Sequence, residues 1–314
     1  MVAKLSKKGS QRMSSECTAR NDGVSGHHFT EVSIGEMQTQ SRCFGKLSLD
    51  TTISERELQY LDEAKGFGGY ERFSGRNGRW TAIMLRNRDG DARDERSHEH
   101  ESIAKPTEHW HHLPCLARLL DDHFDLDLVS NVRVMQAVAG GMILAHRDYK
   151  EHLGGGFNRI HVPIRTSPYA VSAEGSTVYH QRHLECWLVE GREVHSALNA
   201  GHTTRHHVTL DFPVSIALER VFRKSLLKVD SVAVLDRSPL PDKWKQFIEV
   251  VGFGMRQDTV EFVATALNRL AFIYDIDFAS VYDHLVQAAE FSVDPECVRL
   301  ATELRTYMLF ARQE

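Results

Sequence analysis

The sequence predicts a mainly β domain, a sandwich or barrel, followed by a helical C-terminal region. Many short extended segments with turn residues between them fill the middle of the chain, and after about Phe222 apolar residues recur at helical spacing instead. The composition, 41% hydrophobic and 26% charged, is that of a globular protein. The segments expected to be extended are 131–138, 142–148, 158–165, 176–180, 184–190 and 203–211.

Three elements are expected before these strands. Ser54 followed by Glu57 is a capping signature, so we expect a helix over 54–65. The segment 79–87 is expected to be a strand and 116–124 an amphipathic helix.

The chain divides into three expected parts. Residues 1–42 are rich in Ser, Lys, Gly, Thr and Gln and are expected to form a disordered extension. Residues 43–222 are expected to form the β domain, and 223–314 a helical subdomain without obvious chemistry. Its expected helices begin near Asp258, Asp277 and Glu296.

Charge and hydropathy exclude some classes of function. The net charge is −5 and no long basic run occurs, so nucleic-acid binding is not indicated. No apolar stretch approaches the roughly 18 residues of a membrane span, and the first residues lack the apolar core of a signal peptide. The five cysteines form no CxxC pattern, so we expect a cytoplasmic protein without disulfides.

The most informative residues are His146, Asp148 and His195. If the backbone at 146–148 is extended, the imidazole and the carboxylate point to the same side, and His195 completes a triangle. Two His and one carboxylate on one face of a metal are the arrangement of non-haem Fe(II) oxygenases. Arg205 adds a cation that can hold a dicarboxylate cosubstrate, so the pattern predicts a 2-oxoglutarate-dependent hydroxylase.

A second group of residues is expected to line the same pocket. Alternation places Arg159 and His161 on one face of their strand and apolar residues on the other. Arg133 interrupts an otherwise apolar strand. A buried Arg is costly unless it meets an anion, either a ligand carboxylate or a structural salt-bridge partner. Trp187 and Trp80 are candidates for an apolar pocket wall or for the core.

Two other kinds of site receive less support. His98, His100 and Glu101, with the histidines of 109–112, resemble a second metal cluster, but their place in a charged loop favours solvated residues. A Ser-His-Asp hydrolase is not indicated, because no Gly-x-Ser-x-Gly motif is present.

Four segments together form a pattern that is known from one family: His146–Tyr149, Arg159–Pro163, His195–Ala197 and Arg205–Asp211. With them, the chain from about residue 45 onward resembles the aspartyl/asparaginyl β-hydroxylase family of Fe(II)/2-oxoglutarate dioxygenases, and within it the bacterial proline hydroxylases of the cis-4 type. Further likeness lies in Arg79-Trp80, the helix at 119–124, Glu185-Cys186-Trp187 and the helical tail.

The resemblance implies a double-stranded β-helix, a cupin-like jelly roll, with a C-terminal helical subdomain. It also implies that Fe(II) binds His146, Asp148 and His195, and that Arg205 and His161 hold 2-oxoglutarate. O2 is then the oxidant and ascorbate an activator. By position, Arg133 and Arg159 correspond to residues that face the substrate carboxylate, and Trp187 to a residue of the pocket wall.

The expected substrate is a small free L-amino acid, with L-proline giving cis-hydroxyproline, or a cyclic analogue such as L-pipecolate. The alternatives are hydroxylation of Asp or Asn in a polypeptide and a non-catalytic jelly-roll binding module. The sequence leaves the oligomeric state, the ring position and the role of the N-terminal extension open.

Overall fold

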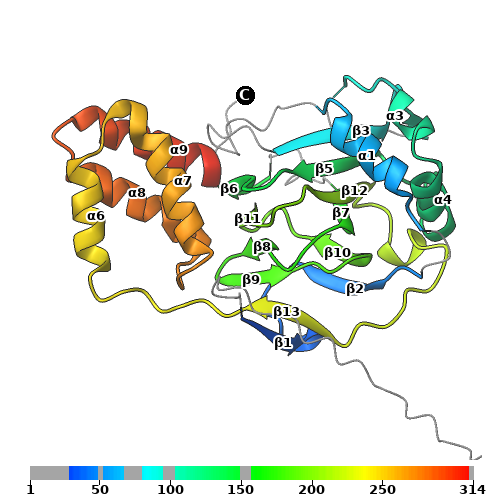
Figure 1. Ribbon diagram of the computed structural model, residues 1–314, viewed down its shortest axis with the longest axis horizontal. Coiled ribbons are helices and arrows are strands. Elements are labelled where there is room, and N and C mark those ends of the chain that lie inside the picture. Colours follow the sequence, from blue (N-terminus) through cyan, green and yellow to red (C-terminus); the bar gives the residue numbers. More distant parts are fainter. Residues whose placement is uncertain (1–27, 49–51, 67–79, 95–102, 149–156, 311–314) are drawn as a thin grey trace, which may run out of the picture.

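The computed structural model describes residues 28–48, 52–66, 80–94, 103–148 and 157–310. Two antiparallel sheets face one another, and helices lie at either side of them (Figure 1). The six-stranded sheet runs, in spatial order, β1 (Phe29–Ser33), β13 (Ser231–Leu235), β9 (Thr177–His180), β8 (Ala170–Glu174), β11 (His195–Asn199) and β6 (Met142–His146). The seven-stranded sheet runs β2 (Arg42–Lys46), β10 (Glu185–Val189), β7 (Phe157–Arg165), β12 (Arg205–Pro213), β5 (Asn131–Ala137), β3 (Trp80–Asn87) and β4 (Lys105–Pro106). This architecture confirms the predicted mainly β jelly-roll fold with C-terminal helices.

Alternation along β5, β7 and β12 divides the seven-stranded sheet into two faces. Val132, Ile160 and Leu210 belong to the fully buried core on the outer face. The shorter helices pack on this face: α1 (Glu55–Glu63), α3 (Glu108–His111) and α4 (Pro114–His123). The opposite parity, which includes Arg133 and His161, faces the interior between the sheets.

The N-terminal helix starts as the capping signature predicts. Ser54 Oγ accepts from the Glu57 amide, and the Glu57 carboxylate accepts from the Ser54 amide, both at 3.3 Å. The second carboxylate oxygen of Glu57 accepts from the Cys115 amide at 2.6 Å. The cap therefore also ties α1 to the start of α4.

The C-terminal helices form a separate layer beside β6 and β11 (Figure 1). They are α6 (Trp244–Phe253), α7 (Val260–Ala271), α8 (Val281–Glu290) and α9 (Pro295–Leu309). The last three, α7, α8 and α9, match the predicted helices closely. Among the described residues, no helix has both the length and the apolarity of a membrane span.

Two predicted boundaries need correction. Residues 29–33 form β1, paired over its whole length with β13, although 1–42 were expected to be disordered. Residues 1–27 lie outside the described part. β13 itself falls after the expected boundary at 222, so the jelly roll extends to Leu235 before the helices begin. Both corrections have one cause, because each strand is stabilised by a partner roughly 200 residues away in the chain.

Candidate active site

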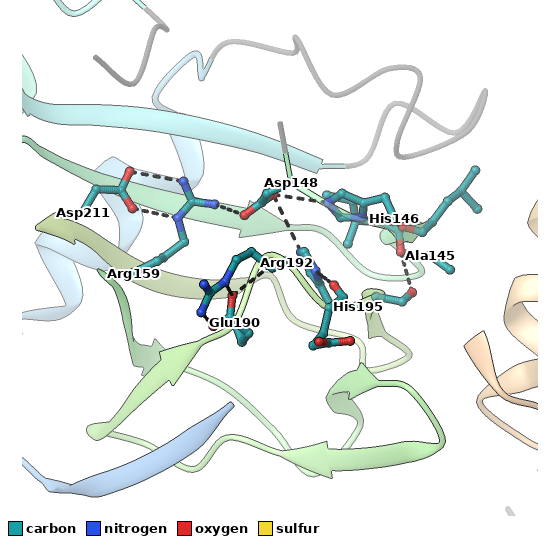
Figure 2. A network of polar contacts seen from close by, with 12 residues as sticks. Ala145, His146, Asp148, Arg159, Glu190, Arg192, His195 and Asp211 are labelled. Atoms are coloured by element: carbon teal, nitrogen blue, oxygen red, sulfur yellow. Dashed lines mark hydrogen bonds and ion pairs between the residues drawn. The ribbon is translucent and has the colours of Figure 1, made fainter. Parts of the chain in front are cut away.

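The three predicted ligands come together between the sheets. His146 ends β6, Asp148 follows it by two residues, and His195 begins β11, the neighbour of β6. Figure 2 shows both imidazoles turned toward the Asp148 carboxylate. Asp148 Oδ1 lies 3.7 Å from His146 Nε2 and 3.8 Å from His195 Nε2. One donor atom from each residue lies within 4.8 Å of the others, which is the spacing required to share one metal ion.

Hydrogen bonds on the far side of each ring leave Nε2 available for a metal. His146 Nδ1 donates to the Leu144 carbonyl at 2.7 Å, and His195 Nδ1 donates to the Glu193 carbonyl at 2.9 Å. A carbonyl oxygen only accepts, so Nδ1 of each ring carries a proton, and Nε2 is the nitrogen that would bind a metal. The donor set of two imidazoles and one carboxylate fits a ferrous ion with open coordination positions.

Asp148 is held in place by its neighbours. Arg159 Nη1 donates to Asp148 Oδ2 at 2.6 Å, which leaves Oδ1 facing the imidazoles (Figure 2). The Asp148 amide donates to the Gly191 carbonyl at 2.8 Å. A Cβ on Gly191 would lie 2.2 Å from Asp148 Oδ2, so only glycine at this position leaves room for the carboxylate. Gly191 could not be identified from the sequence, because its importance depends on a contact across the fold.

The predicted arginines of the inner face do meet an anion within the protein. Arg159 Nε donates to Asp211 Oδ1 at 2.7 Å, and Arg133 Nη2 donates to Asp211 Oδ2 at 2.9 Å. Asp211 is fully buried. The pairing follows from the strand register, which places Asp211 opposite Arg159 and two residues along β12 from Thr209, the partner of Arg133. The salt-bridge alternative is thus present, and both arginines also line the cavity beside the ligand cluster.

Arg205 occupies a different environment. Its side chain is 3% exposed, its guanidinium lies 5.0 Å from the centre of the Trp80 ring, and Nη2 donates to His207 Nδ1 at 2.8 Å. Nε and Nη1 have no hydrogen-bond partner. Burial lowers the pKa of Arg205 to about 9. A buried cation with unused donors on a cavity wall is a site prepared for an anion.

The cavity between the sheets joins the ligand cluster to Arg205. Its empty volume is about 650 Å³, including the space at its mouth, which suits a small molecule. Besides the predicted residues, Tyr179 and Thr209 line it. His161 Nδ1 and Thr209 Oγ1 are buried without hydrogen-bond partners. Burial, reinforced by the charge of Arg205, lowers the pKa of His161 well below its usual range, so His161 is neutral.

Trp187 does not form part of the cavity wall, and that prediction is corrected. Its side chain is fully buried, its ring stacks on Tyr179 with 4.8 Å between centroids, and Nε1 donates to Glu185 at 2.8 Å. Tyr179 faces the cavity in its place. Trp187 pairs with His161 of β7 and therefore lies on the inner face as alternation predicts, but Tyr179, from the opposite sheet, stacks over its ring and separates it from the cavity. Trp80, in contrast, does line the cavity.

The histidine-rich region contributes no second metal cluster among the residues that the structure places. His109 accepts from or donates to the Tyr60 hydroxyl at 2.7 Å, and His112 stacks on the Tyr60 ring. Within the described ranges, His146, Asp148 and His195 form the one group with metal-compatible spacing. His98, His100 and Glu101 lie outside those ranges.

Comparison with known proteins adds independent observations. Residues 50–214, just over half of the chain, match the family model described as "Aspartyl/Asparaginyl beta-hydroxylase", and residues 219–314 match "L-proline 3-hydroxylase, C-terminal". The L-proline cis-4-hydroxylase of Rhizobium meliloti (strain 1021) is 27% identical over 272 residues, covering 86% of this chain and 95% of that protein. L-proline cis-3-hydroxylase 2 of a Streptomyces species is 25% identical, covering 87% and 96%. Among solved structures, a 2OG-Fe(II) oxygenase family oxidoreductase from Burkholderia pseudomallei matches with a TM-score of 0.33 and 11% identity, covering 51% of this chain and 80% of that one.

Proposed function

Because the chain belongs to the aspartyl/asparaginyl β-hydroxylase family and is a 2-oxoglutarate-dependent dioxygenase, we propose that it hydroxylates a free L-amino acid, L-proline or a cyclic analogue such as L-pipecolate. One observation carries the proposal: the His146, Asp148 and His195 cluster shares a cavity with Arg205, a buried cation that has unused donors. The first group fits Fe(II) and the second fits a carboxylate.

We assign the cosubstrate end of the cavity to Arg205. Its unused Nε and Nη1 donors would hold the far carboxylate of 2-oxoglutarate, and the Trp80 ring keeps the guanidinium plane in place. Neutral His161 and Thr209 offer further polar atoms to the same ligand. Bound Fe(II) with 2-oxoglutarate and O2 supplies the oxidising chemistry, with succinate and CO2 as coproducts, while the protein positions the ligands and excludes water.

The charge of the cavity supports a substrate with a carboxylate. Arg133, Arg159 and Arg205 line the cavity together with one carboxylate, that of Asp148. Asp211, outside the lining, pairs with Arg133 and Arg159. We assign the substrate carboxylate to the side of Arg133 and Arg159, next to the metal ligands. The relatives named for L-proline support the choice of a cyclic amino acid, and the small volume of the cavity supports a free amino acid over a polypeptide segment.

The proposal is tested by turnover with defined amino acids. Apoprotein is reconstituted without air with Fe(II), 2-oxoglutarate and ascorbate, then exposed to air with each of a panel of free L-amino acids, Asp and Asn included, and with Asp- and Asn-containing peptides. We expect one added oxygen on proline or pipecolate, with matching succinate, by mass spectrometry. Oxidation of the peptides alone would move the assignment to a polypeptide hydroxylase. Absence of succinate with every candidate, with iron bound, would favour a binding module.

A further inference from the structure

The strand that carries His146 is an edge strand. β6 pairs with β11 on one side, and its other side faces the C-terminal helices (Figure 1). The Ala145 amide donates to Asn268 Oδ1 at 2.8 Å, and the Tyr282 hydroxyl donates to the Ala145 carbonyl at 2.7 Å. Two residues on, the Arg147 amide donates to the Met308 carbonyl at 3.0 Å.

These contacts occur at alternate residues, as the backbone hydrogen bonds of a further neighbouring strand would. In an antiparallel sheet, alternate residues direct their backbone groups to opposite neighbours, so Ala145 and Arg147 both face away from β11. A buried edge without partners would leave these groups unsatisfied at a cost of about 1–3 kcal/mol each. Helices α7, α8 and α9 each supply one partner, and His146 lies between the two residues that they hold.

Asn268 also reaches the strand that carries the second histidine. Its Nδ2 donates to Ser196 Oγ at 3.1 Å, and Ser196 Oγ donates to the Ile143 carbonyl of β6 at 2.7 Å. Ser196 directly follows His195. Asn268 is completely buried. One amide side chain therefore binds the residue before one imidazole ligand and the residue after the other.

We propose that Asn268, with Tyr282, is a positioning residue for the metal centre, through which the helical layer sets the distance and orientation of the two histidines. Loss of a hydrogen bond that orients a metal ligand typically weakens metal binding by about 10- to 100-fold. The inference rests on the proposed metal site and is independent of the proposed substrate.

The test is Co(II) binding by the metal-free full chain, followed by the visible absorption of the bound ion. We expect Asn268→Ala to weaken Co(II) binding by about 10-fold or more, and Tyr282→Phe by about 3- to 10-fold, with altered band positions or intensities in both. Thr265→Val is the matched control for the first, because Thr265 lies in the same helix and donates to the Glu261 carbonyl instead. Tyr274→Phe is the control for the second, because the Tyr274 ring contacts Trp244. Both controls are expected to bind Co(II) as the wild type does.

Amide exchange gives a second readout that needs no metal. The peptide that contains residues 142–148 is expected to exchange faster in Asn268→Ala and Tyr282→Phe than in the controls. Wild-type affinity and spectrum in both variants would overturn the proposal, as would equal weakening in the controls, which would indicate general destabilisation. If Asn268→Ala does not fold, the comparison of Tyr282→Phe with Tyr274→Phe decides. A wild-type protein that binds no Co(II) would refute the metal site itself and, with it, this inference.

Discussion

Replacing Arg205 by methionine is expected to make the metal-free, ligand-free protein more stable while it destroys cosubstrate binding. Arg205 is 3% exposed and has no carboxylate partner among the residues that the structure describes. Methionine has a similar length, so it fills the space against Trp80 without the charge. The stability of the apoprotein should therefore rise while its affinity for 2-oxoglutarate falls, as expected for a residue whose role is to bind a ligand.

The magnitude follows from the burial of the guanidinium. A pKa lowered from 12.5 to about 9 corresponds, at about 1.4 kcal/mol per pH unit, to a cost of about 5 kcal/mol for the charged form. The hydrogen bond to His207 and the contact with the Trp80 ring offset about 3 kcal/mol of this. We expect Arg205→Met to raise the free energy of unfolding by about 2 kcal/mol, or Tm by about 4 °C. The loss of a bidentate charged contact should weaken 2-oxoglutarate binding by about 100-fold.

The assay is urea denaturation of the apoprotein beside calorimetric titration of 2-oxoglutarate into the Co(II)-loaded protein. Arg133→Met is the matched control, because Arg133 is also buried but donates to Asp211 at 2.9 Å. Breaking that pair should destabilise the protein by about 3 kcal/mol. An Arg205→Met variant less stable than the wild type, or one that still binds 2-oxoglutarate with wild-type affinity, would refute the reasoning.

Three further predictions concern the site and its surroundings. Gly191→Ala places a Cβ 2.2 Å from Asp148 Oδ2, so we expect Co(II) affinity to fall by about 10-fold or more with circular dichroism unchanged; unaltered affinity would contradict the contact. Trp187→Phe should lower the free energy of unfolding, measured in urea, by about 2 kcal/mol. The KM for the amino acid should stay at its wild-type value, because Trp187 lies behind the cavity wall; a large change in KM would show that Trp187 contacts the substrate. Burial lowers the pKa values of His161 and His207 well below 6.5. Below pH 6.5 the unfolded chain therefore takes up protons that the folded protein does not, and these two histidines alone should lower the free energy of unfolding by up to about 2.7 kcal/mol per pH unit on acidification toward pH 5.5. A flat urea midpoint between pH 7.5 and 5.5 would contradict this.

The ligand residues could be predicted from the sequence because their chemistry is local. His146 and Asp148 are two positions apart, and the parity of Arg159 and His161 on one strand places both in the cavity. The apolar residues of the opposite parity pack in the core, as alternation requires.

The features that were missed depend on contacts distant in sequence. Asp211 meets Arg133 and Arg159 only through the register of three strands, and Gly191 matters only because Asp148 lies against it. β1 has a polar sequence and pairs with β13 across most of the chain. The helical tail carries no catalytic motif, yet its Asn268 contacts both histidine-bearing strands.

The most direct test of the account is one measurement with L-proline under ¹⁸O2, in the presence of Fe(II) and 2-oxoglutarate. We expect each hydroxyproline formed to carry one ¹⁸O atom and to appear with one succinate, and His146→Ala, folded as the wild type, to yield neither product. Hydroxyproline from the His146→Ala variant at the wild-type rate would contradict the ligand assignment. Wild-type protein with bound iron that consumes 2-oxoglutarate with no oxygen gained by proline would contradict the proposed substrate.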